Sequence, residues 1–256
     1  MSANFLVPGQ SLRQLILDLN SIHAEKNERE KMFTTPLGCL AFIAGVRNEM
    51  SNEMTKREGR RLPSLIPNFM KRLFTLVGVW GVDRFLASLQ SKYPSSDCGY
   101  CGKLPCACGS EKVTPWTRTN IELSPDQDRW SLGSWQSHHL LVYGQKNRTR
   151  SLKDCLESHS GEFFEALTVA TWLEYAMRYG HPTEQAEQAL SLELADMFMR
   201  TISIANYLVV DIETLIQRRY ASGCAKCHNL RCRCPSTIED FHLFERETMA
   251  ATRLAE

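Results

Sequence analysis

The sequence lacks a long apolar run, a dominant charge and any convincing strand pattern. No stretch approaches the roughly 18 apolar residues that a membrane helix needs, so we expect no membrane partner. The 30 basic residues are nearly matched by 29 acidic ones, which argues against a broad basic surface for nucleic acid. The first ten residues lack the basic region and apolar segment of a secretory signal peptide, which favours a cytoplasmic protein.

Cysteine, by contrast, is abundant and ordered. Eight of the ten cysteines form two clusters with the same spacing, C-x2-C-x4-C-x-C: Cys98, Cys101, Cys106 and Cys108, then Cys224, Cys227, Cys232 and Cys234. Four thiolates this close in sequence can surround a tetrahedral structural zinc, so we expect two Zn²⁺ ions per chain. Disulfides are the alternative, and they would need an oxidising compartment. A catalytic zinc is disfavoured because four thiolates leave no position for water.

The repeated spacing indicates an internal repeat. Each cluster follows a basic residue and a tyrosine, Lys92-Tyr93 in one case and Arg219-Tyr220 in the other. We expect one copy over residues 1–108 and a second over 130–235, joined by a linker over 109–129. Proline, serine and threonine are frequent in this linker. Residues 236–256 have apolar spacing compatible with an amphipathic tail helix.

Each copy has the apolar periodicity of a set of helices, which predicts an all-α protein. In the first copy, we expect helices over 12–22, 37–54, 69–79 and 82–93. In the second copy, we expect them over 131–143, 152–179, 184–208 and 211–220, with Asp211 as an N-cap.

The second copy carries two pairs of carboxylates at helical spacing. Glu162 and Glu165 lie three residues apart, and so do Glu193 and Asp196 on the next helix, which puts each pair on one helix face. If these helices are antiparallel neighbours, the four acids face one another at the edge of an apolar core. Such a cluster favours Mg²⁺ or Mn²⁺. The alternative is a pair of ordinary solvated helix faces.

This arrangement of acids resembles that of a known family. The pattern E-x-x-E, followed after 27 residues by E-x-x-D, is similar to that of the all-alpha nucleoside triphosphate pyrophosphohydrolases of the MazG type. Gly161-Glu162-Phe-Phe-Glu165 resembles the family's second helix, and Glu193-Leu-Ala-Asp196 resembles its E-L-A-D helix, whose later polar position falls at Asn206. The resemblance covers roughly residues 131 to 235.

The resemblance implies a function and a site. The four acids would bind magnesium, which holds a nucleoside triphosphate, while an activated water attacks the alpha phosphorus and releases a nucleoside monophosphate and pyrophosphate. In the first copy the corresponding places fall near Ala41, Ala44, Leu65 and Asn68, which implies a degenerate copy without the metal site. The two copies would pair as an intramolecular pseudo-dimer, and a homodimer of such tandem chains is a further option.

The chain departs from the family at His159, where many members carry another glutamate. His159 could favour manganese, could hydrogen-bond a phosphate, or could mark a catalytically impaired nucleotide-binding or protein-binding pseudoenzyme, which is the alternative function. Asn206 is a further candidate nucleotide contact.

Other residues allow two interpretations. Trp135, His139 and Tyr143 could stack on a base or belong to the core, and Lys146, Arg148 and Arg150 could meet phosphates or form a solvated loop. Lys226, Arg231 and Arg233 surround the second cluster and would suit a nucleic acid. The first cluster has only Lys103, so nucleic acid is the less favoured partner.

Overall fold

The computed structural model describes residues 6–29, 35–108, 125–147 and 149–234. The predicted tail helix over 236–256 and linker residues 109–124 lie outside these ranges. Within them, the chain forms eight α-helices, one short 3₁₀ helix and no β-strand, so the predicted all-α class is confirmed. None of the described helices is long and apolar enough to cross a membrane. The helices are α1 Leu12–Arg29, α2 Pro36–Arg57, α3 Leu62–Trp80, α4 Val82–Lys92, the 3₁₀ helix Pro125–Arg129, α5 Leu132–Asn147, α6 Leu152–Tyr179, α7 Glu184–Tyr207 and α8 Ile212–Tyr220.

Capping residues set several of the helix ends. The Thr35 side chain accepts a hydrogen bond from the Gly38 N–H at the start of α2. Ser151 begins α6 with a capping box, and Gly180 ends that helix at a φ of 69°, a value that favours glycine. Asp211 accepts from the Thr214 N–H at the start of α8, so this predicted N-cap is confirmed.

Helix α3 begins at Leu62, seven residues before the predicted start at Phe69. Pro63 lies in the first turn, where its missing N–H has no partner to lose. Pro67 lies inside the helix and removes one backbone hydrogen bond. Leu62, Leu65 and Ile66 are buried. Their burial stabilises the first turns of α3 although these turns contain both prolines.

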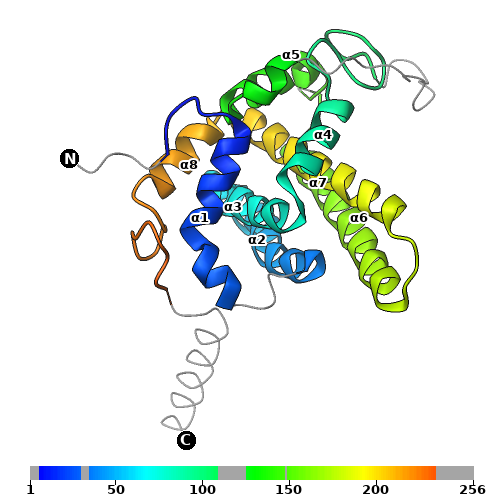
Figure 1. Ribbon diagram of the computed structural model, residues 1–256. Coiled ribbons are helices and arrows are strands. Elements are labelled where there is room, and N and C mark those ends of the chain that lie inside the picture. Colours follow the sequence, from blue (N-terminus) through cyan, green and yellow to red (C-terminus); the bar gives the residue numbers. More distant parts are fainter. Residues whose placement is uncertain (1–5, 30–34, 109–124, 148, 235–256) are drawn as a thin grey trace, which may run out of the picture.

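The helices of the N-terminal half (residues 6–108) and of the C-terminal half (residues 125–234) make matching contacts. Helix α2 pairs with α3, and α6 pairs with α7 (Figure 1). Helix α1 packs on α3, and α5 packs on α7. Between the halves, α2 contacts α6 and α3 contacts α7, while α4 lies against α7 and α8 lies against α3.

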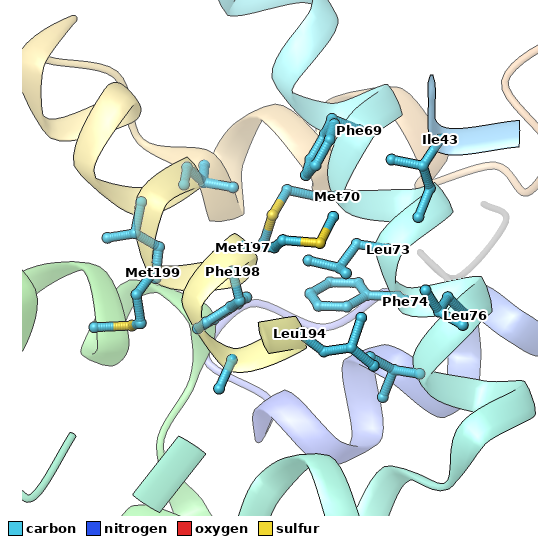
Figure 2. Packing of buried hydrophobic residues seen from close by; sticks show 14 of the residues in the cluster. Ile43, Phe69, Met70, Leu73, Phe74, Leu76, Leu194, Met197, Phe198 and Met199 are labelled. Carbon is cyan, nitrogen blue, oxygen red and sulfur yellow. The ribbon is translucent and has the colours of Figure 1, made fainter. Parts of the chain in front are cut away.

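The core lies at the contact between α3 and α7, where side chains of the two helices face one another (Figure 2). Phe198 of α7 is fully buried. Its ring lies 6.2 Å from that of Phe74 on α3, 5.8 Å from Phe85 on α4 and 6.5 Å from Trp135 on α5. One residue therefore joins helices of both halves in a single core.

Replacing Phe198 with alanine is expected to lower the free energy of unfolding by about 3–5 kcal/mol, because it leaves a cavity at this junction. Phe164→Ala is the matched control, since its ring is 51% exposed and lies 4.8 Å from the Arg47 guanidinium, a contact of about 0.5–1 kcal/mol. Denaturant unfolding of both variants checks the prediction. Equal losses in the two variants would contradict it.

Candidate metal sites

In each cysteine cluster the four sulfur atoms lie within 4.8 Å of one another. The sulfurs of Cys98 and Cys108 are 3.7 Å apart, and those of Cys224 and Cys234 are 3.8 Å apart. Four sulfurs at the corners of a tetrahedron, each about 2.3 Å from a central zinc, would be separated by about 3.8 Å. None of the eight cysteines is joined in a disulfide. Both clusters therefore could bind zinc, and neither contains a disulfide.

The backbone folds alike in the two clusters. The residue after the second cysteine of the first cluster, Gly102, has a φ of 61°, and the corresponding His228 has a φ of 54°. The Cys98 N–H donates to the Lys103 carbonyl at 3.2 Å, as the Cys224 N–H does to the Asn229 carbonyl at 2.9 Å. This turn brings the two cysteine pairs of each cluster together.

Backbone N–H groups favour the thiolate form at one position of each cluster. Burial raises the pKa of Cys101, but hydrogen bonds from two backbone N–H groups and from the thiols of Cys108 and Cys98 together lower the pKa to about 7. The same balance lowers the pKa of Cys227 to about 6. Because thiolates are the form that binds a metal, these turns are suited to zinc.

Each cluster docks on the first helix of the opposite half. The Cys106 N–H donates to the Val142 carbonyl of α5 at 2.8 Å, and the Cys232 N–H donates to the Ile22 carbonyl of α1 at 2.7 Å. Each cluster also directly follows the last helix of its own half. The clusters therefore fasten the halves to each other.

Three of the four predicted acids converge. Carboxylate oxygens of Glu162 and Glu165 on α6 and of Glu193 on α7 lie within 4.8 Å of one another. Glu162 is only 9% exposed, while Glu165 is exposed. One oxygen of Glu193, Oε2, is buried without a hydrogen-bond partner. This group has the donors and the unsatisfied charge that a hard cation requires.

Asp196 lies beside this group of three acids and has partners of its own. Its Oδ1 accepts a hydrogen bond from the Tyr93 hydroxyl at 2.5 Å, and its Oδ2 forms an ion pair with Lys92. Lys92 is the last residue of α4 and Tyr93 follows it, so the N-terminal half contributes to the acidic site. The sequence analysis recognised that a basic residue and a tyrosine precede both cysteine clusters. It did not predict that Lys92 and Tyr93 contact the acidic site.

A second cation, Arg200 of α7, also belongs to the site. Its Nε donates to Glu162 Oε1 at 2.9 Å. Arg200 lies two helical turns from Glu193, and the sequence pattern of paired acids gave no reason to include it. Lys92 and Arg200 thus neutralise part of the acidic charge.

Glu162 and Glu193 are harder to ionise than free carboxylates. Burial, and then the nearby Asp196, raise the pKa of Glu193 to about 7. The same two causes raise the pKa of Glu162. Crowding of negative charge thus acts with burial, and both effects would be relieved by a bound cation.

The raised pKa of Glu193 predicts that the stability of the metal-free protein depends on pH. Glu193 titrates near pH 4.3 when unfolded and at about 7 when folded, so the folded state binds more protons between these values. Stability therefore falls as pH rises from about 4.5 to about 7. We expect Glu193→Gln, which cannot ionise, to show a melting temperature that rises relative to wild type over this interval. A constant difference between the two proteins in thermal scans from pH 4.5 to 8 would contradict this expectation.

His159 lies in the core and does not join the group of three acids. It is 1% exposed, and its ring packs edge-on against Phe69 of α3, with the ring centroids 4.5 Å apart. Burial, followed by the charges of Arg47 and Arg200, lowers its pKa to about 3, so the ring is neutral. A phosphate contact by His159 stays a prediction, and the observed packing gives it a structural role.

His139 and Asn206 contact each other and hold α5 against α7. The Asn206 amide nitrogen lies 3.3 Å from His139 Nδ1, and Gln136 donates to the Asn206 side-chain oxygen at 3.0 Å. His139 is 6% exposed, and burial is the main cause that lowers its pKa to about 3. Among the aromatic candidates, Trp135 is fully buried and Tyr143 is 9% exposed. These side chains belong to the core, the second of the two interpretations.

The basic candidates between α5 and α6 do not form one group. Lys146 is exposed in the last turn of α5. Arg150 instead donates to the Asp154 carbonyl at 3.1 Å and to the Ser158 hydroxyl, so it supports the first turns of α6. Arg148 lies outside the described residues.

Comparisons of the chain with family models, with curated proteins and with solved structures find no match. The functional argument therefore depends on the geometry of the two kinds of site: the cysteine clusters and the acids at the α6–α7 contact.

Proposed function

We propose that the chain is a magnesium-dependent nucleoside triphosphate pyrophosphohydrolase with two structural zinc ions. The observation that carries this proposal is the convergence of Glu162, Glu165 and Glu193 within 4.8 Å, with a buried Glu193 oxygen that lacks a partner. The pattern of these acids is also the one that resembles the MazG-type family.

The charges at the site suit one divalent cation. With Asp196 included, four carboxylates face two cations, Lys92 and Arg200, so full ionisation of the acids would leave a net charge of −2. Partly buried charge of this size is costly unless it is compensated. Oxygen donors favour Mg²⁺ or Mn²⁺ over softer metals, so the donor set fits the cation that the resemblance implies.

Each residue then has a role. Glu162, Glu165 and Glu193 would hold the ion, and Tyr93 and Lys92 would hold Asp196 in place beside it. Bound magnesium would offset the charge of the phosphates and lower the pKa of a coordinated water. Glu193, whose Oε2 has no hydrogen-bond partner, would also accept a proton from the attacking water. The products would be a nucleoside monophosphate and pyrophosphate.

We also infer that the two halves are copies that pair as an internal pseudo-dimer, each with a zinc knuckle. Their matching helix contacts and the reciprocal hydrogen bonds of Cys106 to α5 and of Cys232 to α1 support this inference. The N-terminal copy lacks the acids, but its Lys92 and Tyr93 contact Asp196. It would therefore complete the site of the C-terminal copy.

The direct test is pyrophosphate release from a mixed pool of ribonucleoside and deoxyribonucleoside triphosphates. The reaction is run with Mg²⁺, with Mn²⁺ and with no added divalent ion. We expect release only with a divalent ion. Release that is independent of added metal, or no release with either ion, would reject the hydrolase.

One observation favours a second candidate, a nucleotide-binding pseudoenzyme. Both oxygens of Asp196 already have partners, which leaves three acids for the metal. In that case the protein would bind a nucleoside triphosphate with Mn²⁺, as measured by calorimetry, and the nucleotide would be recovered intact.

A further inference from the structure

Helix α6 exposes a row of aromatic side chains along its second half. Trp172, Tyr175 and Tyr179 are 62%, 54% and 59% exposed. Because an α-helix turns by about 100° per residue, these three residues share one face of α6 with Gly161 and Thr168, within an arc of about 80°. All five residues are exposed, and we call them the α6 stripe.

The α6 stripe differs from an ordinary solvated helix face. Helix α6 packs on α7 and α2 and lies at the edge of the bundle (Figure 1). A helix face that meets water usually carries charged side chains, but none of the five stripe positions is charged, although they span residues 161–179. The matching helix of the N-terminal half, α2, exposes polar and charged side chains in its second half: Asn48, Glu49, Asn52, Thr55 and Lys56. The repeated fold therefore does not require an aromatic surface at this place.

The side chains of the stripe are already arranged for an apolar contact. The Tyr175 ring lies 4.6 Å from the Tyr179 ring and stacks on His181 at 6.0 Å. Rings that are ordered before binding lose little conformational entropy when a partner covers them. The Thr168 hydroxyl donates to the Phe164 carbonyl of its own helix at 2.8 Å. Its methyl group can therefore be covered without leaving a buried donor unpaired.

The order of small and large residues makes the stripe complementary to itself. Gly161 and Thr168 come first, and the aromatic residues follow. If two α6 helices pack antiparallel about a two-fold axis, Gly161 of one copy lies opposite Tyr179 of the other, and Thr168 lies opposite Trp172. A Cβ added at Gly161 would have no atom within 4 Å, so there is space for a ring. Small residues facing large ones allow close packing.

We propose that the α6 stripe is the interface of a homodimer in which two α6 helices pack antiparallel. A buried aromatic side chain covers about 150–250 Å², so the three half-exposed rings offer roughly 250–450 Å² per chain. Phe164 lies in the same arc but packs against the Arg47 guanidinium, 4.8 Å away, so it adds less. The rings of two copies would bury about 500–900 Å², which is below the roughly 1,200–2,000 Å² of a standard interface. We therefore expect a weak dimer with a micromolar Kd, independent of hydrolysis at the acidic site.

The test is the molar mass of the zinc-loaded full chain, measured by sedimentation equilibrium over a micromolar concentration series with a reductant present. We expect reversible association from 29.2 kDa to twice that mass. Trp172→Lys should raise the Kd at least about tenfold, because it removes a ring and brings two like charges into the interface. Leu141→Lys is the matched control. Leu141 of α5 is also 62% exposed, and this variant should associate like wild type.

Gly161→Gln tests the antiparallel pairing itself. Glutamine favours a helix more than glycine does, so the melting temperature of the monomer should not fall. The new side chain would occupy the place of the Tyr179 ring, so the Kd for dimerisation should rise. In a Tyr179→Ala background the rise should be smaller, because residues in contact have coupled effects. Equal rises in the two backgrounds would reject the antiparallel pairing and with it the proposal.

Two further results would overturn the proposal. A wild-type chain that stays at 29.2 kDa throughout the series would mean that a second copy does not cover the stripe. A dimer that persists unchanged in Trp172→Lys, or that is lost in Leu141→Lys, would place the interface on another surface.

Discussion

Cys232→Ser is expected to remove one zinc ion per chain and to destabilise the whole fold. Cys232 is 2% exposed, its sulfur lies 3.4 Å from that of Cys224, and its N–H is bound to the Ile22 carbonyl of α1. The loop is too short to have a core of its own, so zinc would supply its folding energy. Structural zinc sites contribute an apparent ~10–16 kcal/mol, which exceeds the cost of any single core truncation.

Metal analysis by mass spectrometry and thermal unfolding check this prediction together. Cys155→Ser is the matched control, because Cys155 is a buried free thiol outside both clusters, and it should retain two zinc ions. A Cys232→Ser protein with two zinc ions and an unchanged melting temperature would show that the cluster is not a structural zinc site.

Glu193→Gln is expected to lower kcat/KM for triphosphate hydrolysis by about 10³-fold or more. The substitution keeps the size of the side chain but removes the charge that would hold the metal. It also removes the group suited to accept the proton of water, a role worth about 10²–10⁴-fold by itself. The first loss weakens metal binding, and the second slows the chemical step.

The comparison protein is Glu184→Gln, in which the exchanged carboxylate lies in the exposed first turn of the same helix, α7. It should retain wild-type activity. Circular dichroism of both variants checks that each keeps the helical fold. Equal activity in Glu193→Gln and Glu184→Gln would show that Glu193 takes no part in the reaction and would reject the proposed site.

Local features of the sequence were sufficient to predict most helices. Helix α6 spans the predicted residues because Ser151 caps its start and Gly180 ends it, and both signals are encoded within a few residues. The cysteine spacing likewise predicts the grouping of the four sulfurs in each cluster. The helical spacing of Glu162, Glu165 and Glu193 predicts that they meet once α6 and α7 are neighbours.

Contacts between distant segments could not be predicted in this way. Lys92 and Asp196 are separated by 104 residues, and their pairing depends on how α4 packs against α7. The position of His159 depends on Phe69, which belongs to the other half. The packing of α8 on α3 likewise joins segments that are far apart in the sequence.

The most direct test of the proposed reaction is hydrolysis in ¹⁸O-labelled water with Mg²⁺, followed by mass spectrometry of the products. Attack on the alpha phosphorus, the reaction that the acids at the α6–α7 contact are proposed to perform, places one ¹⁸O atom in the nucleoside monophosphate and none in pyrophosphate. Label in released pyrophosphate or orthophosphate, or no labelled product at all, would contradict the account.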